Sequence, residues 1–480
     1  MFRLIQSEYK KLWKKKVPAI LLLLLLGWTF YSTMRDYHKE MPSMAFPVVF
    51  ESEDHQKIRD GLEYYQYADT YLHQYAGELS EDLVEQMESD YHRLMKKYER
   101  KTLDDKRMSE AYGEDWENFI KTAAQGGYDQ EQLDALLADM TYSGYSSDGE
   151  HYYFEIYYEE DPMRMLYERI YTGTTQYLTS DSLYSVGGED EEKEIELKSY
   201  PFTTQKPYLK DQITMYKGIQ SAQEQELFDN LLDKRIDTTA SFDSVVGIQL
   251  FLNSLGNIDM LTLLFIILLL SDIFSQEVSY KSDQIIVPTK EGAKRLVVAK
   301  LLCGISAALG IILLQFLIIL GCAMVFVPLR SFALPMMAQA DGGYFGMIPY
   351  VFTYHEGFIG TLLLIILASL ATAVLTMALS LFTKNRFATV SVMMIILFGG
   401  FTLSLYVEGG LAYVSSLLPP VMMKTTAFFS WKSNGFLPVI PMGSSMITWR
   451  YALSVIWILF MLLLCGFIVR YDHRHIVKNT

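Results

Sequence analysis

The chain has 480 residues, half of them apolar, yet it carries 56 acidic against 41 basic side chains, for a net charge of −15. The charge is unevenly distributed: residues 35 to 255 contain 46 acidic and 21 basic side chains, whereas the rest of the chain contains 10 and 20. An acidic segment of domain size is therefore joined to a basic part that holds long apolar runs. These proportions exclude a soluble cytosolic enzyme, and no basic groove-lining segment indicates nucleic acid as a partner.

Six stretches are long and apolar enough to cross a bilayer as helices, which takes about 17 to 25 residues. The first follows a basic segment, as a signal peptide would, but Trp28, Phe30 and Tyr31 stand where a small-residue cleavage site would be, so we expect a retained anchor. The sequence therefore predicts a polytopic α-helical membrane protein with six transmembrane helices. The predicted spans are 17–34, 258–274, 301–327, 358–382, 387–407 and 451–469.

The short loops predict the orientation, because Lys and Arg near span ends stay on the cytoplasmic side. With the N-terminus inside, the outer loops 328–357 and 408–450 hold 4 Lys and Arg residues, and the cytoplasmic segments hold 16. We therefore expect both termini in the cytoplasm and residues 35–257 outside the plasma membrane. The cytoplasmic segments are 1–16, 272–300, 383–386 and 470–480.

No predicted span has an ionisable residue at its centre, since Asp259 and Asp272 lie at the two ends of the second. A proton relay or ion-coupled carrier would keep a charged residue at mid-membrane, so secondary transport is disfavoured. Small and hydroxyl residues recur in the fourth span and allow close helix contact, either within one subunit or across a dimer seam. They are Gly360, Ser369, Ala371, Thr372, Ala373, Thr376, Ala378 and Ser380.

The cytoplasmic loop 275–300 has an ordered pattern of charge. An acidic residue follows the second span, a short segment ends at a proline, and basic residues lead into the third span. The alternating signs suit docking on a mixed-charge protein surface, although in isolation such a loop could equally be a solvated turn. The residues that we assign to docking are Glu277, Lys281, Asp283, Pro288, Lys290 and Arg295.

The N-terminal segment 1–16 has apolar residues at helical spacing on one side, with lysines largely elsewhere. This pattern predicts an amphipathic helix lying on anionic lipid, with a solvated positive-inside anchor as the alternative. The apolar residues are Phe2, Ile5, Tyr9, Leu12 and Trp13.

The N-terminal helix, followed along the chain by the 275–300 loop, resembles the permease subunits of type-2 ABC exporters. In that family the loop forms a coupling helix seated on the ATPase subunit. The inner turn 381–385, the Leu418-Pro419-Pro420 segment and the ending 467–472 are also similar to that family. The resemblance covers the first 35 residues and everything after about residue 255. The insert 35–257 resembles the subgroup with an extended extracytoplasmic domain.

The resemblance implies a bacterial permease that exports an amphipathic peptide, a lipid-like molecule or a drug. Its implied partners are two ATPase subunits that bind ATP and Mg, a second copy or a sister permease, and membrane lipid. The chain has no Gly-x-x-x-x-Gly-Lys-Ser/Thr phosphate cradle, so we expect no cofactor and no ATPase activity of its own. The alternative is a membrane-anchored peptide receptor or immunity module that signals through its spans without transport.

For residues 35–257 we expect a mainly helical α+β extracytoplasmic domain. Two helices are predicted between Ile58 and Lys101, interrupted at 77–80, a third after Asp129, and a strand over 152–158. No disulfide is expected there, because the only cysteines are Cys303, Cys322 and Cys465, in apolar runs.

An acidic run in this segment could capture a cationic substrate, or it could simply keep the surface solvated. It consists of Glu189, Asp190, Glu191 and Glu192. No catalytic residue and no metal site is predicted anywhere in the chain. The outer loop 408–450 contains a Pro pair between apolar stretches and is either re-entrant or a plain surface loop.

Overall fold

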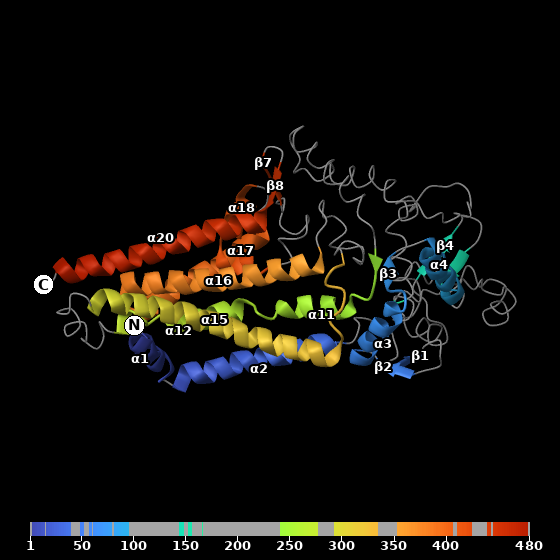
Figure 1. The fold of residues 1–480 in the computed structure, drawn as a ribbon, viewed down its shortest axis with the longest axis horizontal. Coiled ribbons are helices and arrows are strands. Elements are labelled where there is room, and N and C mark those ends of the chain that lie inside the picture. The colour runs from blue at the N-terminus through green and yellow to red at the C-terminus, as the bar shows by residue number, and fades with distance from the viewer. Residues whose placement is uncertain are drawn as a thin grey trace, which may run out of the picture. The chain divides into compact units, whose positions relative to one another are not determined.

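The computed structural model is mostly helical in the residues that it describes (Figure 1). The chain divides into two compact units, one of residues 1–38, 69–78 and 176–480 and the other of 39–68 and 79–175. The described residues are 2–14, 16–39, 49–51, 57–59, 61–78, 81–95, 144–147, 152–155, 166, 241–276, 292–334, 353–406, 410–424, 439–442 and 445–478.

Among the described residues, six helical segments are long and apolar enough to cross a membrane, as the sequence predicts. This confirms a multi-pass membrane protein. Five are single helices: α2 (Lys16–His38), α15 (Gly292–Phe326), α16 (Tyr354–Thr383), α17 (Arg386–Tyr406) and α20 (Trp449–Lys478). The sixth consists of α11 (Val246–Leu255) and α12 (Met260–Leu270).

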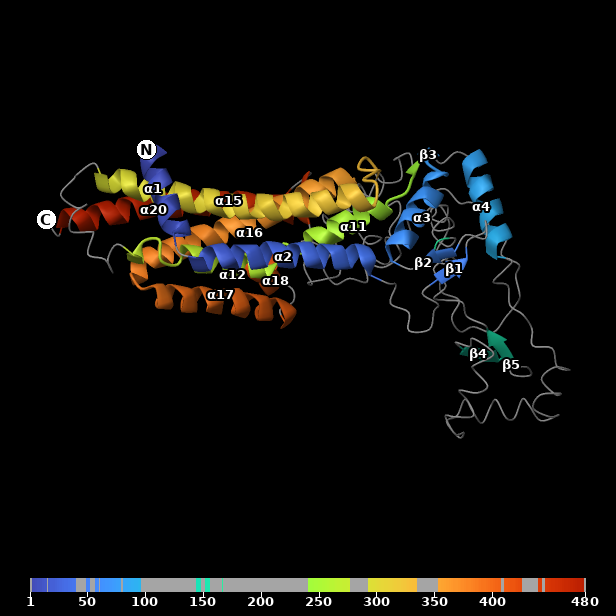
Figure 2. The same ribbon diagram turned by 90° about the horizontal axis from the view of Figure 1, so that it is seen from below.

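Helix α16 lies at the centre of this bundle and packs against α12, α15, α17 and α20. Figures 1 and 2 show these helices running side by side. All eight small and hydroxyl residues that the sequence singles out in the fourth span are buried within this one chain. Thr372 and Thr376 satisfy their hydroxyls on carbonyls one turn earlier, at 2.8 and 2.7 Å. These residues therefore serve helix packing within the subunit.

Helix α1 (Phe2–Trp13) packs against α15 and crosses it at one end of the bundle (Figure 2). The described N- and C-terminal ends of the chain lie at this same end (Figure 1). The core here combines α1, α2, α12, α15, α16 and α20, and it includes Leu12, Leu25, Ile266, Leu270, Cys303, Met377 and Ile468.

Two short helices, α18 (Gly410–Ser416) and α19 (Pro419–Met422), follow α17 and pack among the spans. The indole of Trp457 donates to Leu417 O at 3.0 Å, and that of Trp449 donates to Ser416 Oγ at 2.7 Å. Side chains of α20 thus bond to one backbone carbonyl and one hydroxyl group at the turn between α18 and α19. The antiparallel strands β7 (Val439–Met442) and β8 (Ser445–Thr448) precede α20.

In the long insert, the predicted pair of helices is present as α3 (Leu62–His73) and α4 (Glu81–Met95). Residues 57–59 form a strand rather than the start of the first helix. The antiparallel pairs are β1 (Val49–Glu51) with β2 (Lys57–Arg59), β3 (Gly77–Glu78) with β6 (Ser241–Phe242), and β4 (Gly144–Ser147) with β5 (Tyr152–Glu155). The helix predicted after Asp129 and the acidic run 189–192 lie outside the described residues.

Candidate functional site

The second candidate span is interrupted between α11 and α12. Tight backbone bonds close the turn: Gly256 N donates to Asn253 O and Asn257 N to Ser254 O, both at 3.0 Å. The carboxylate of Asp259 then caps α12 by accepting from Leu261 N at 2.9 Å. Non-helical backbone at membrane depth persists only where protein groups or water satisfy it, and broken spans are typical of transport pathways.

Helix α2 provides polar partners for this break. Asn257 Nδ2 donates to Asp36 Oδ2 at 2.7 Å and lies 3.5 Å from Thr33 Oγ1. Arg35 Nη2 lies 3.9 Å from the other oxygen of Asp36. The break in the second span is therefore held against the last turns of the first.

A second polar contact joins three spans inside the bundle. Gln315 on α15 is fully buried; its Oε1 accepts from Thr262 Oγ1 at 3.1 Å and its Nε2 donates to Thr29 Oγ1 at 2.8 Å. Thr29 in turn donates to Leu25 O at 3.0 Å. Thr29, Thr262 and Gln315 each lie at least eight residues from the end of their span. Buried amides in apolar surroundings hold helices in a defined arrangement because an unpaired amide would be costly.

The sequence prediction for the second span differs from the structure in its bounds. The apolar helix begins at Val246 instead of residue 258, so Asp259 lies within the span and not at its outer end. The physical reason is that Gly256 and Asn257 are typical turn residues and Asp259 is a typical helix cap, so the pattern predicts a helix start there. Gln315 was not predicted as a site residue. The sequence feature that could have indicated it is an amide side chain in the middle of the third apolar run.

Replacing Gln315 by Leu should destabilise the bundle by about 1–2 kcal/mol, because two interhelical hydrogen bonds are lost in apolar surroundings. Denaturation of the full-length protein in mixed micelles measures the loss. Thr262→Val should cost clearly less in the Gln315→Leu background than in the wild type, since both variants remove the same bond. Additive effects would contradict a direct contact.

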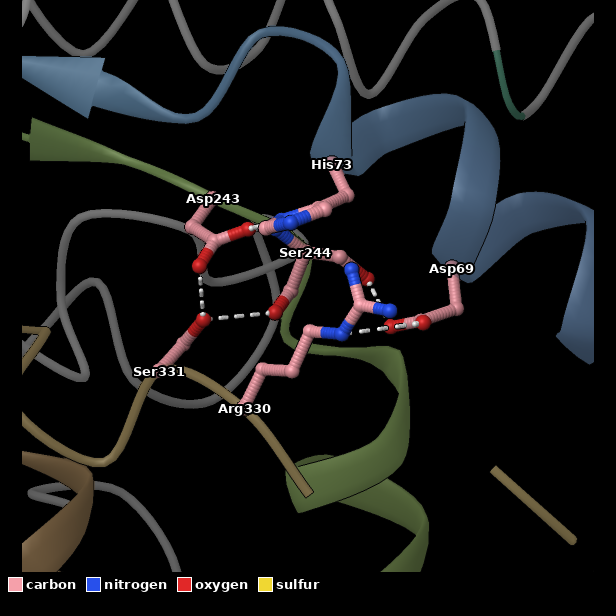
Figure 3. Close-up of polar contacts among 6 residues, drawn as sticks. All are labelled: Asp69, His73, Asp243, Ser244, Arg330 and Ser331. Atoms are coloured by element: carbon pink, nitrogen blue, oxygen red, sulfur yellow. Dashed lines mark hydrogen bonds and ion pairs between the residues drawn. The ribbon is translucent and has the colours of Figure 1, made fainter. Parts of the chain in front are cut away.

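Six polar residues from three distant segments form a connected cluster, named here the Asp243 cluster (Figure 3). They come from the end of α3, the residues just before α11 and the loop after α15. All six belong to the first compact unit. They are Asp69, His73, Asp243, Ser244, Arg330 and Ser331.

Asp243 is the hub of the cluster. Its Oδ1 accepts from Ser244 N at 2.6 Å and lies 2.6 Å from His73 Nδ1, and its Oδ2 accepts from Ser331 Oγ at 2.7 Å. Ser331 Oγ is also 2.8 Å from Ser244 O. The carboxylate of Asp243 therefore joins all three segments.

Asp69 forms the second half of the cluster and is only 1% exposed. Its Oδ1 accepts from Ser244 Oγ at 2.6 Å, and its Oδ2 lies 3.7 Å from Arg330 Nε. The buried carboxylate thus has both a hydrogen-bond donor and a cation beside it. Oδ2 accepts no hydrogen bond, so the charge of this oxygen is offset by the Arg330 cation alone.

The loop that follows α15 is tightly constrained around this cluster. Ser331 has a φ of 66°, in the left-handed region that residues with a side chain rarely adopt. A Cβ added to Gly247, the second residue of α11, would lie 2.1 Å from Pro328 O. The close approach of α11 to this loop therefore requires glycine at 247.

The structure places the five predicted membrane-surface residues on α1 in different environments. Leu12 is buried and Tyr9 Oη lies 2.5 Å from Ser306 Oγ of α15, whereas Phe2 is 80% exposed. Ile5 and Trp13 are half-buried.

The face of α1 that meets the bundle also buries Glu8, whose carboxylate pairs with Lys11 at 2.6 Å. Glu8 was not predicted, although it lies one turn from Leu12 on the same face.

Lys424, just after α19, lies close to the end of α17. Its Nζ donates to Ser404 Oγ at 2.8 Å and lies 4.4 Å from the ring centroid of Phe401. Burial lowers the pKa of this amine. The residue was not predicted either.

Most residues predicted to dock on an ATPase lie outside the described part of the chain: Glu277, Lys281, Asp283, Pro288 and Lys290. Arg295 is described and is exposed near the start of α15. The acidic residues Glu189, Asp190, Glu191 and Glu192 also lie outside. Within the described ranges, no group of three or more His, Cys, Asp or Glu residues could hold a metal ion.

Compared with known proteins, the chain matches no family model, no curated protein and no solved structure.

Proposed function

We propose that the chain is the permease subunit of an ATP-driven exporter of the type-2 ABC kind, in which separate ATPase subunits hydrolyse ATP. The observation that supports this best is the path of the second span. Its inner end runs directly into the loop predicted to dock on the ATPase, and its outer half is broken and bonded to α2. One element thus connects the predicted docking loop with the interior of the bundle.

The contacts of this span suit transmission of a movement. At Thr262 the span meets Gln315 of α15, and at Asn257 it meets Asp36 of α2. A shift of α12 would therefore change contacts at two levels of the bundle. A receptor whose spans only anchor an outer segment has no need for a broken, polar-bonded span, so these contacts favour transport over the receptor alternative.

The proposed orientation has both termini in the cytoplasm and the segment between the first two spans, residues 39–245, outside. The 16 to 4 distribution of Lys and Arg supports it, as does the position of both described chain ends at the same end of the bundle (Figure 1). The assembly would hold two ATPase subunits with ATP and Mg, and a second copy or a sister permease. An amphipathic peptide, a lipid-like molecule or a drug is the proposed substrate, with the insert as an extracytoplasmic α+β domain.

Co-purification tests this proposal. The full-length chain, expressed together with the ABC ATPase subunits of its own cell, should be isolated as a complex that hydrolyses ATP. Glu277→Lys should weaken that complex by several kcal/mol, because it sets a like charge against the docking surface. The matched reversal Glu78→Lys, in β3 far from the loop in sequence, should leave it intact. If no such ATPase binds the wild-type chain, the proposal is wrong.

A further inference from the structure

Lys300 is buried in the interior although lysine is rarely buried. It lies eight residues after the start of α15 and is 1% exposed. Lysine is almost never fully buried unless its amine has partners, and such residues near a membrane core are functional candidates.

The contacts of Lys300 explain how it is accommodated. Its Nζ donates to Ile273 O at 2.8 Å and lies 5.0 Å from the ring centroid of Phe274. Both residues belong to the turn that follows α12. A carbonyl just beyond a helix C-terminus and an aromatic face both favour a cation. Lys300 therefore ties α15 to the end of the second span.

Ser380 of α16 is hydrogen-bonded to the same turn. Its Oγ donates to Ser271 O at 2.9 Å and accepts from Phe274 N at 3.3 Å. Ser380 is fully buried, as is Ser271. The turn 271–276 is thus bonded to two other spans.

These ties lie at the base of the predicted docking loop. The chain leaves the turn at residue 276 and re-enters the described structure at Gly292, the first residue of α15. Lys300 therefore bonds the turn before the intervening segment to α15, the helix that follows it. Because the two ends are tied together, a force on the segment acts on α12 and α15 as one body.

We propose that Lys300, supported by Ser380, is the positioning residue that couples the docking loop to the second and third spans. This rests on the proposed function for the role of the loop, and it goes beyond that function by naming the contact that transmits the movement. Lys300→Met retains the length of the side chain and removes the donor. Ser380→Ala removes the second tie with a minimal change of volume.

Limited trypsin digestion of the full-length chain tests the tie without any ATPase. Cleavage at Arg295, in the first turn of α15, should be about tenfold faster in Lys300→Met, because losing a bond to a charged donor raises the population in which this turn is open by about that factor. Ser380→Ala should also accelerate cleavage. The matched control Lys424→Met removes a lysine with the same type of contacts elsewhere and should cleave like the wild type. Equal rates for Lys300→Met and the wild type would overturn the inference.

Hydrogen exchange in the complex with the ATPase subunits separates coupling from simple stabilisation. In the wild type, ATP with vanadate should change exchange in residues 277–291 and also in 260–276. In Lys300→Met the change should be confined to 277–291, whereas a merely structural role would leave the nucleotide-dependent difference intact.

The two measurements distinguish failure of the coupling role of Lys300 from failure of the proposed function. A nucleotide-dependent change that still reaches 260–276 in Lys300→Met would show that Lys300 does not transmit the movement. If nucleotide changes exchange nowhere in the wild-type complex, the proposed function itself is wrong, and the coupling role is lost with it. Unaltered exchange in α20 verifies that each variant is folded.

Discussion

Gly247→Ala should destabilise the protein by more than about 3 kcal/mol, as expected when a new atom meets backbone that cannot yield. The added Cβ would lie 2.1 Å from Pro328 O and 3.2 Å from Val327 Cγ1. Ordinary contact needs at least 3.4 Å, so the carbonyl or α11 would have to move by more than 1 Å. The higher helix propensity of alanine offers only about 1 kcal/mol in return. The steric clash therefore outweighs the gain in helix propensity, and the net effect on stability is destabilising.

Thermal unfolding of the detergent-solubilised full-length protein measures this loss, and size-exclusion chromatography reports aggregation. Gly310→Ala and Gly321→Ala are matched controls inside α15, because nothing lies within 4 Å of a Cβ added at either position. Both controls should be neutral or stabilising by up to about 1 kcal/mol. Equal stability of Gly247→Ala and these controls would contradict the close approach of α11 to the loop after α15.

Asp243→Ala should destabilise the first compact unit by about 2–4 kcal/mol, because hydrogen bonds to a charged group are among the stronger ones and their losses are not additive. The variant removes the acceptor of Ser244 N and Ser331 Oγ and the partner of His73. His73 is about half exposed, so solvent screens its share of the effect. Most of the loss comes from the contacts to Ser244 and Ser331.

Hydrogen exchange at residues 69–78 and 241–249 locates the effect, and thermal unfolding gives its size. Asp243→Asn keeps an acceptor for Ser244 N and should lose less than Asp243→Ala. Asp90→Ala breaks an exposed pair with Arg93 on α4 and should cost under about 1 kcal/mol. If Asp243→Ala resembles Asp90→Ala, the cluster does not hold the three segments together.

The elements that could be predicted from the sequence are those that depend mainly on the hydropathy and spacing of residues close together in the chain. The spans at 17–34, 358–382, 387–407 and 451–469 agree with the helices to within a few residues, because about 20 apolar residues are needed to cross a bilayer. The pair α3 and α4 follows from the helical spacing of the apolar residues. Helix α1 follows from the same reasoning.

The second span shows where local reasoning fails. Gly256, Asn257 and Asp259 predict a turn and a helix start, and such a start does occur at Met260. The same pattern could not show that the preceding ten residues, α11, also pack within the bundle against α2 and α15. That assignment depends on contacts with residues more than 50 positions away.

The hydropathy of each residue and its helix-forming tendency are properties of the local chain, so the sequence by itself determined the membrane class, the number of spans and the amphipathic N-terminal helix. Tertiary structure alone decided that Gln315 bonds to Thr29 and Thr262, that Asp243 joins His73 to Ser331, and that Lys300 is buried on Ile273 O. The physical reason is that a buried polar group is stable only with a partner, and the partner is chosen by packing between distant segments.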